Sequence, residues 1–460
     1  MLLEEISNNE TDNLYNLLNS ISLSLSVIDN EISYEALKET KIISLLLKFI
    51  NLNISNKKII LKIFECLNII VKLIKDEKCF DFFYSNRIEY IKIYINLLSQ
   101  YEKDNEVYKL IVTLLCDIQI NSASNQNITM NNAIFRMIYE HYNNAICFFN
   151  NYSNDFIPFF YLLSSYSKIP YDDSNKDFQK KVQEFIFTII KQLYFIDFPF
   201  QDNQHKMLTL IFQTCVNLSQ STESNIYNDF FIEDISNQSV IQMLFSFTVD
   251  NKIILIDYFV TIVGNLVTNG KEIMLQIYKC DVLSFLISNL KDQSTQEHTK
   301  GLIIWALSNI CDESSLIELM FQLNVFNILL LTLHTNPSIE TLTQILWCFG
   351  NGIIACDYSQ CLEFLNIPLI QELKNILTTY KDPLILLRVL QCLNSLFEKG
   401  NICMTVKSGD KSDQMMIDNV YVLKFCEVGG EDILHHISGY IKNETVISYI
   451  DKILSVYYNK

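Results

Sequence analysis

The chain has 460 residues, of which 49% are hydrophobic and 19% are charged. This balance excludes global disorder and allows a large core. Its formal net charge of −17 argues against nucleic acid as a partner, because phosphates would repel so acidic a protein, and it suits basic partners instead. No apolar run approaches the ~18 residues of a membrane span, so we expect no membrane partner.

Cysteine usage indicates the compartment. The thirteen cysteines are scattered, and the first segment, Met1–Glu5, lacks the basic and then apolar pattern of a secretory signal. Both features favour reduced, mostly buried thiols. We therefore expect a protein of the cytoplasm or nucleus.

Long helices joined by short loops are expected, because ten Gly and six Pro leave few helix breakers. Residues 1–35 are expected to form an irregular N-terminal cap, and residues 36–220 a set of divergent repeats. The third helices of these repeats are expected to carry Phe64–Asn68, Thr113–Asp117, Tyr161–Ser165 and Gln213–Asn217. From residue 68, through 117, 165 and 217, to residue 265, the steps are 49, 48, 52 and 48 residues.

Residues 221–400 repeat more regularly. An asparagine marks each expected third helix, and successive markers are 44, 42 and 43 residues apart: Asn265, Asn309, Asn351 and Asn394. This period lies in the ~40–47-residue range of armadillo and HEAT repeats. One complete repeat predicts helices over Leu316–Phe321, Val325–Leu331 and Ile339–Ile354. Residues 401–460 are expected to form a C-terminal capping repeat.

Both tryptophans of the chain stand four residues before a marker, as Trp305 with Asn309 and Trp347 with Asn351. Positions i and i+4 share one helix face, so stacked repeats would align these side chains into a ladder. Indoles can sandwich the stem of a Lys or Arg, and Asn carboxamides can bond a peptide main chain. The alternative is packing inside the solenoid. Repeated Asn on a buried face is less favourable, because an unpaired buried amide costs about 1–3 kcal/mol.

The order and spacing of these motifs resemble a known family over about residues 220–460. The segments that carry the resemblance are Gly264–Asn269, Trp305–Asn309, Trp347–Asn351, Leu390–Gly400 and Cys426–Leu434. Together they are similar to importin-alpha, the armadillo adaptor that carries cargo with a nuclear localisation signal.

The resemblance implies an all-α, right-handed armadillo superhelix that acts as an adaptor and is not an enzyme. It implies that basic localisation-signal peptides of cargo bind the smaller, C-terminal groove in the cytoplasm and nucleus. The residues implied to hold the peptide are Asn265, Trp305, Asn309, Trp347 and Asn351, with Asn68 and Thr261 as weaker candidates.

The chain departs from the family pattern in several places. It opens without the basic segment that binds importin-beta, so a carrier of that type would need another route. Only Asn68 keeps the family's residue in the early repeats, and Thr261 stands where an arginine is expected. The usual glutamates near the groove are absent, and Asp312 and Glu313, just past the ladder, are candidates to replace them.

These departures keep a second hypothesis open, an armadillo scaffold that holds a non-nuclear partner. An enzyme is disfavoured, because no arrangement of nucleophile and base is visible. We also expect no cofactor or metal. Cys356 and Cys361 have no second pair or nearby His, and no Lys follows Gly264 or Gly350 as a phosphate loop requires.

Overall fold

A computed structural model of the chain describes its main helical segments. They are residues 10–27, 33–53, 55–74, 176–195, 202–220, 238–269, 271–407 and 419–458, with single residues and pairs at 93–167 and 231–235. The chain forms two compact units, Met1–Ile226 and Tyr227–Lys460. Each unit is described by itself below.

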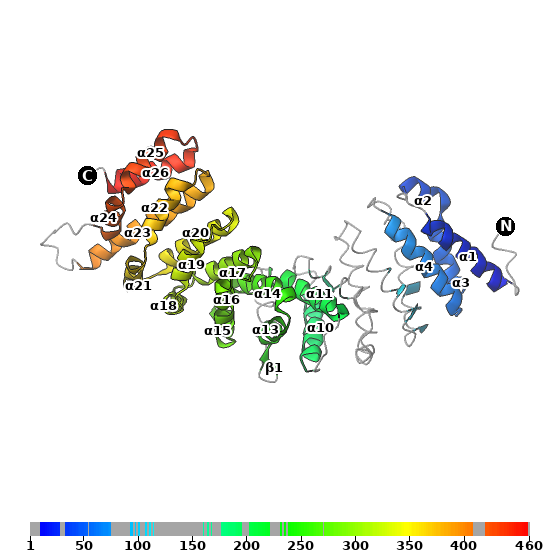
Figure 1. The fold of residues 1–460 in the computed structure, drawn as a ribbon. Coiled ribbons are helices and arrows are strands. Elements are labelled where there is room, and N and C mark those ends of the chain that lie inside the picture. The colour runs from blue at the N-terminus through cyan, green and yellow to red at the C-terminus, as the bar shows by residue number, and fades with distance from the viewer. Residues whose placement is uncertain are drawn as a thin grey trace. The chain divides into compact units, whose positions relative to one another are not determined.

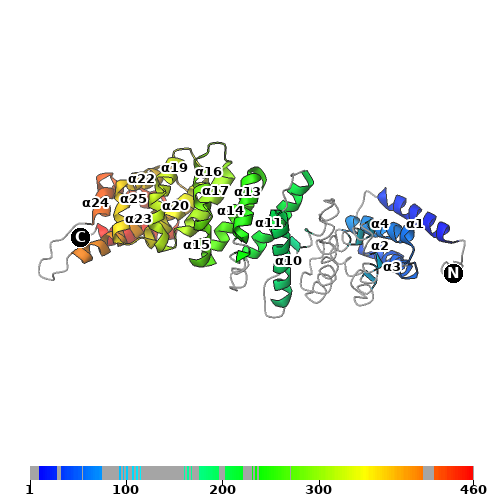
Figure 2. The ribbon, with the colours of Figure 1, turned by 90° about the horizontal axis from the view of Figure 1, so that it is seen from below.

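The second unit is a stack of three-helix repeats. In chain order its helices are α13 (Val240–Asp250), α14 (Lys252–Leu266), η4 (Val267–Asn269), α15 (Lys271–Lys279), α16 (Val282–Lys291), α17 (Glu297–Ile310), η5 (Ser314–Leu316), α18 (Ile317–Gln322), α19 (Val325–Leu333), α20 (Ile339–Ala355), α21 (Tyr358–Glu363), η6 (Phe364–Asn366), α22 (Leu369–Thr379), α23 (Pro383–Lys407), α24 (Val420–Glu427), α25 (Gly430–Tyr440) and α26 (Glu444–Tyr457). The third helices α14, α17, α20, α23 and α26 contact one another in series. Figure 1 shows them following one another in chain order, and Figure 2 shows α14, α17, α20 and α23 in the same order.

A recurring turn separates the first and second helices of the repeats. Asp281, Asn324 and Gly429 stand directly before α16, α19 and α25 with φ of 62°, 59° and 76°. This left-handed conformation suits Gly and is tolerated by Asn and Asp. The turn chemistry thus fixes where each second helix begins.

The start of α20 is held by side chains from two repeats. The Ser338 hydroxyl accepts a hydrogen bond from the Thr341 amide at 3.2 Å, which caps the helix. The Ser338 amide donates in turn to the Glu297 carboxylate on α17. This hydrogen bond lowers the pKa of Glu297.

Phenylalanines fill the core between successive repeats. The ring of Phe326, which is fully buried, lies 4.8 Å from Phe321, 5.7 Å from Phe349 and 4.9 Å from Phe364, measured between ring centroids. These rings come from α18, α19, α20 and η6, so the cluster joins two repeats.

The first unit contains α1 (Glu10–Ser26), α2 (Tyr34–Thr40), α3 (Ile42–Leu52), α4 (Lys57–Leu73), α10 (Lys176–Phe195) and α11 (Asp202–Ser219). Helix α1 contacts α4, so the expected N-terminal cap includes a regular helix. The Glu65 carboxylate on α4 accepts hydrogen bonds from Ser22 at 2.7 Å and from Lys62. The segments Thr113–Asp117 and Tyr161–Ser165 lie largely outside the described residues.

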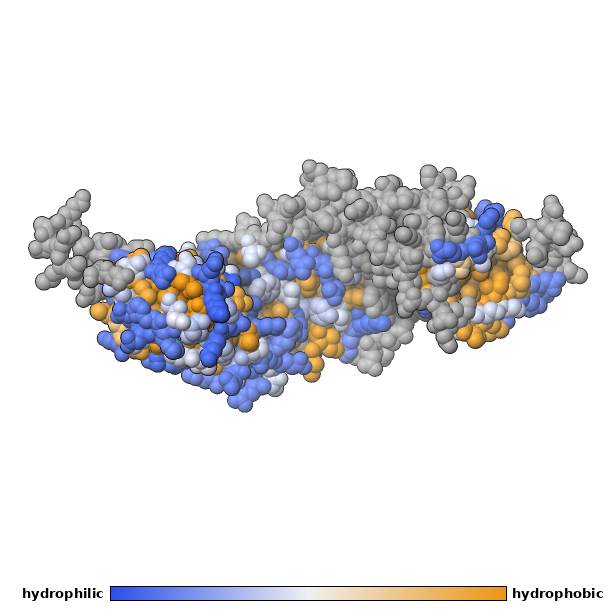
Figure 3. Space-filling model, turned by 90° about the horizontal axis from the view of Figure 1, so that it is seen from above, coloured by the Kyte–Doolittle hydropathy of each residue, from blue (hydrophilic) through white to orange (hydrophobic). Residues whose placement is uncertain are grey.

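Strands contribute little to the described part of the chain. One antiparallel pair, β1 (Asp234–Ile235) with β2 (Gln238–Ser239), precedes α13. On the face of the second unit shown in Figure 3, hydrophilic residues surround smaller hydrophobic patches. No single described helix has the length and hydrophobicity to cross a membrane, and one bent pair, Ser314–Gln322 with Val325–Leu333, meets that test by length and composition alone.

Candidate functional site

The predicted ladder lies on three adjacent third helices of the second unit. Helix α14 carries Thr261 and Asn265, α17 carries Trp305 and Asn309, and α20 carries Trp347 and Asn351. The contacts α14–α17 and α17–α20 place these helices next to one another. The spacing read from the sequence therefore corresponds to neighbouring helices in the structure.

Two of the four marker asparagines, Asn309 and Asn351, bond the preceding repeat, whereas Asn394 donates to Glu398 of its own helix at 2.8 Å. The side-chain amide of Asn309 donates to the Gly264 carbonyl at 2.9 Å, and that of Asn351 donates to the Ser308 carbonyl at 3.1 Å. Each acceptor is the residue just before the marker of the preceding repeat. In the first unit Asn217 likewise donates to the Ser164 carbonyl at 3.1 Å. The amide groups thus tie neighbouring repeats together.

The ladder asparagines retain capacity for a ligand. A carboxamide has an acceptor oxygen as well as its NH₂ group. Among the described residues, none donates a hydrogen bond to Oδ1 of Asn309 or Asn351. Those oxygens can accept from the backbone N–H of a bound peptide. The NH₂ group of Asn309 donates once within the fold and that of Asn351 reaches both the carbonyl and the hydroxyl of Ser308, so the oxygens are the freer atoms, and binding of a peptide main chain by these amides stays a prediction.

Trp305 packs tightly against α14. Its side chain is half-buried, and its six-membered ring lies so close to Gly264 that a methyl group there would overlap it. Glycine is required at position 264 because of this close approach. Gly264 therefore receives both the indole of Trp305 and the amide of Asn309.

Trp347 is the more accessible indole, with 40% of its surface exposed. The guanidinium carbon of Arg388, on α23 of the next repeat, lies 3.9 Å from the centroid of its ring. Arg388 also donates to Gln391 at 2.9 Å. One face of Trp347 therefore already holds a cation of the protein itself, which the sequence analysis missed. Its signal was a basic residue 41 positions after Trp347, close to one repeat length.

A cleft of about 440 Å³, here called the ladder cleft, joins part of the ladder to an acidic turn. Its lining residues are Val267, Thr268, Met274, Asn309, Asp312, Glu313, Trp347 and Asn351. Three of the five main predicted residues thus meet in one cleft, together with both carboxylates suggested as substitutes. Asn265 and Trp305 do not line it.

The ladder cleft carries uncompensated negative charge. Asp312 is exposed and Glu313 is half-buried. Among the described side chains, no Lys or Arg forms an ion pair with either carboxylate. Glu313 accepts hydrogen bonds from the Ser315 amide at 3.3 Å and the Ser315 hydroxyl at 2.9 Å, which fixes the turn. The cleft is arranged to attract a cation.

The weaker candidates are placed differently. The Thr261 hydroxyl donates to the Asp257 carbonyl of its own helix at 2.7 Å. Asn68, in the first unit, is 7% exposed, and neither of its amide atoms has a hydrogen-bond partner among the described residues. Phe64, four residues earlier, is fully buried. Since Asn68 faces the core, we leave it out of the proposed site.

The described His, Cys, Asp and Glu residues form no group of three or more that could hold a metal ion. Of the nine cysteines with described side chains, eight are buried and Cys426 is exposed. Burial raises the pKa of the Cys392 thiol to about 12, as expected for a structural rather than a reactive thiol.

Comparison with protein-family models finds no match, and comparison with curated proteins finds no significant match. Solved structures do match. An engineered protein studied by a structural genomics consortium aligns with a TM-score of 0.60, at 11% identity, over 90% of this chain and 98% of its own. A chain from a structure concerning a phosphorylation switch in the interaction between cadherin and beta-catenin aligns with a TM-score of 0.59, at 12% identity, over 96% of this chain and 81% of its own.

A designed armadillo repeat protein in complex with the peptide (KR)4 also aligns, with a TM-score of 0.45, at 16% identity, over 59% of this chain and 99% of its own. At such identities the matches describe the fold alone. The predicted all-α armadillo-repeat solenoid is confirmed. The matches do not single out importin-alpha among armadillo proteins, so that family stays a prediction.

Proposed function

We propose that the chain binds extended basic segments of partner proteins in the ladder cleft. The observation that carries the proposal is one exposed indole, Trp347, in a cleft with two carboxylates that no described cation neutralises. A Lys or Arg side chain would lay its stem on the open part of the indole and direct its charge toward Asp312 and Glu313. The Oδ1 atoms of Asn309 and Asn351 would accept from the peptide backbone.

The expected strength of this interaction is moderate. A cation on an indole contributes about 0.5–2 kcal/mol, and partly exposed ion pairs contribute about 0.2–1 kcal/mol each. Together with main-chain hydrogen bonds, such terms support micromolar affinity, which corresponds to about −8 kcal/mol.

Within this function we propose an importin-alpha-like role, in which the basic segments are nuclear localisation signals of cargo. The motif order over residues 220–460 and the net charge of −17 support it. Cargo would be bound in the cytoplasm and released in the nucleus. A carrier of the importin-beta type would be a further partner in this role.

The second candidate is an armadillo scaffold for a non-nuclear partner. It is favoured by the first unit, where Phe64 and Asn68 are buried at the positions of the family's larger cargo groove. The ladder cleft, which is a short groove, could serve a single partner segment as well as a range of cargo.

The proposal is tested by titrating the protein into a fluorescently labelled basic peptide and measuring anisotropy. We expect micromolar binding that weakens as salt is raised, because salt screens the attraction. The double variant Asp312→Asn/Glu313→Gln should bind roughly 3- to 30-fold more weakly, and Trp347→Ala should lose a similar factor. Glu340→Gln, which removes one exposed carboxylate outside the ladder cleft, is the control for loss of negative charge elsewhere on the second unit.

The outcomes are distinct. No binding by the folded wild type, or equal affinity in the cleft variants and the control, would overturn the proposal. Nuclear accumulation of a basic-peptide cargo in permeabilised cells, dependent on this protein and on added importin-beta-type carrier, would favour the adaptor. Peptide binding without such accumulation would favour the scaffold.

A further inference from the structure

A second cleft adjoins the ladder cleft on the side of the first helices. It measures about 340 Å³ and is lined by Met274, Tyr278, Glu313, Ser315, Leu316, Glu318, Leu319 and Gln322. These residues come from α15 and from η5 and α18 with the turn before them, which are the first-helix regions of two successive repeats. We call it the side cleft.

The side cleft combines an apolar floor with an aromatic ring and two carboxylates. Met274, Leu316 and Leu319 supply the apolar surface. Tyr278 is 54% exposed, so its ring is accessible to a ligand. This composition, apolar walls with an aromatic face and acid groups, parallels that of the ladder cleft.

The carboxylates of the side cleft are held in place but not neutralised. Glu318 accepts a hydrogen bond from Gln322 at 3.2 Å, and Glu313 accepts from Ser315. Among the described side chains, no Lys or Arg pairs with Glu318 or Glu313. The side cleft therefore presents two negative charges without a counter-charge beside apolar surface.

This composition selects one kind of occupant. An acidic group would be repelled, and a purely apolar segment would bury carboxylates without a partner, which is costly. A Lys or Arg side chain satisfies both features, because its stem covers Met274 and Leu319 while its head reaches the carboxylates and the Tyr278 ring.

The side cleft adjoins the ladder cleft, since Met274 and Glu313 line both. An extended peptide advances about 3.3 Å per residue, so its neighbouring residues reach the side cleft once one residue lies beside Trp347. We propose, resting on the function proposed above, that the side cleft takes a second Lys or Arg of the same bound peptide, a few residues from the first. The ligand class becomes a peptide with two spaced basic positions.

The test uses a series of labelled peptides that share one basic residue and carry a second Lys at successive positions, with norleucine at that position as the uncharged reference. In the full-length wild type, we expect Lys at one or two adjacent offsets to bind roughly 3- to 10-fold more tightly than norleucine. In Glu318→Gln/Tyr278→Ala this ratio should fall toward one, while the affinity of the norleucine peptide stays unchanged.

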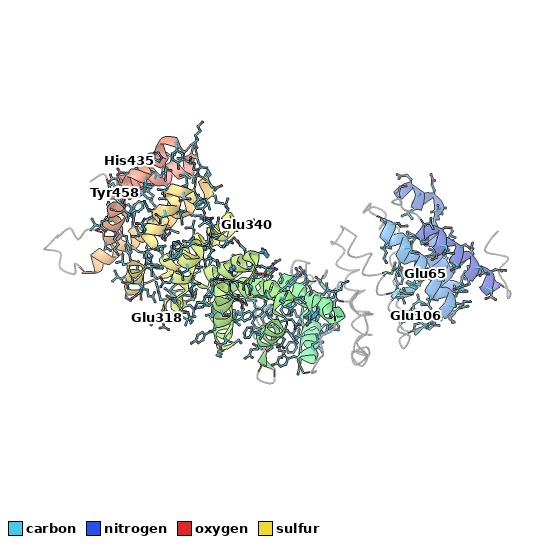
Figure 4. The ribbon with its side chains drawn as sticks, viewed as in Figure 1. Glu65, Glu106, Glu318, Glu340, His435 and Tyr458 are labelled. Atoms are coloured by element: carbon cyan, nitrogen blue, oxygen red, sulfur yellow. The ribbon has the colours of Figure 1, made fainter. Side chains whose placement is uncertain are left out.

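Glu340→Gln is the matched control for loss of one charge. Figure 4 shows Glu318 at α18 and Glu340 near the start of α20, on different sides of the second unit. The control should keep the full Lys-to-norleucine ratio. Because Glu318 and Tyr278 are both exposed, their substitution should leave folding intact, which circular dichroism checks.

The outcomes separate the two proposals. Equal ratios in the wild type and in Glu318→Gln/Tyr278→Ala, or a ratio of one at every offset, would overturn the side cleft as a subsite while leaving the ladder cleft in place. Absence of binding by every peptide would overturn both.

Discussion

The contact between Gly264 and Trp305 gives the sharpest prediction for stability. A methyl group at position 264 would overlap the six-membered ring of Trp305, and overpacking of this kind costs about 1–3 kcal/mol. Because the obstacle is a rigid ring, we expect about 2–3 kcal/mol. Ala is favoured over Gly in a helix by about 1 kcal/mol, which offsets part of this cost. Gly264→Ala should therefore destabilise the second unit by a net amount of about 1–2 kcal/mol.

A double-mutant cycle isolates the contact. In a Trp305→Ala background the obstacle is gone, and the same Gly264→Ala change should stabilise by about 0.5–1 kcal/mol. The coupling between the two positions should therefore be about 2–3 kcal/mol. Urea unfolding followed by tryptophan emission, to which Trp347 contributes in all four proteins, measures each value.

Gly350 provides the control, since it also stands one residue before a marker asparagine. A methyl group there meets only Cys392 Sγ at 3.7 Å, an ordinary contact. Gly350→Ala should stabilise by about 0.5–1 kcal/mol. If Gly264→Ala behaved like Gly350→Ala in the wild type, the close approach of Trp305 to α14 would be wrong.

Three further predictions concern single residues. Arg388→Met should free one face of Trp347 and remove a like charge, so a basic peptide should bind roughly two- to fivefold more tightly in the anisotropy titration; weaker binding would show that Arg388 instead holds the indole in position. The hydrogen bond from Ser338 lowers the pKa of Glu297. The contribution of this carboxylate to the stability of the fold is therefore complete above its pKa in the unfolded chain, and it is lost as pH falls through its pKa in the folded protein. The difference in melting temperature between the wild type and Glu297→Gln should therefore hold at pH 6–7 and shrink below about pH 4; a difference unchanged at pH 3 would contradict this. Cys426 is exposed and Cys311 is buried, so Cys426→Ser should remove one equivalent of fast-reacting thiol in a disulfide-reagent assay and Cys311→Ser none, and the reverse would show that the burial is wrong.

Local signals allowed the repeat itself to be predicted. The helix expected over Ile339–Ile354 is observed as Ile339–Ala355, because Ser338 caps its start and its apolar period continues to its end. The helix expected over Leu316–Phe321 is observed as η5 followed by α18, and the helix expected over Val325–Leu331 is observed as α19. Spacing alone also placed the asparagines on adjacent third helices.

The details of the site depend on how neighbouring helices pack, which sequence patterns do not contain. The bond from Asn309 to the Gly264 carbonyl and the stacking of Arg388 on Trp347 join residues 45 and 41 positions apart. They follow from the separation and rotation of adjacent helices. Asn68 shares the sequence phase of the markers, but its side chain is buried with no hydrogen-bond partner among the described residues, and no pattern in the sequence distinguishes it.

Trp347 allows the most direct measurement of the central claim, that basic peptides bind beside this indole. In Trp305→Phe, Trp347 is the single tryptophan of the chain, and its emission should change saturably with an unlabelled basic peptide. The midpoint should equal the dissociation constant from anisotropy with a labelled peptide, and Asp312→Asn/Glu313→Gln should shift both together. Peptide binding that leaves the Trp347 emission unchanged would place the peptide elsewhere and contradict the account.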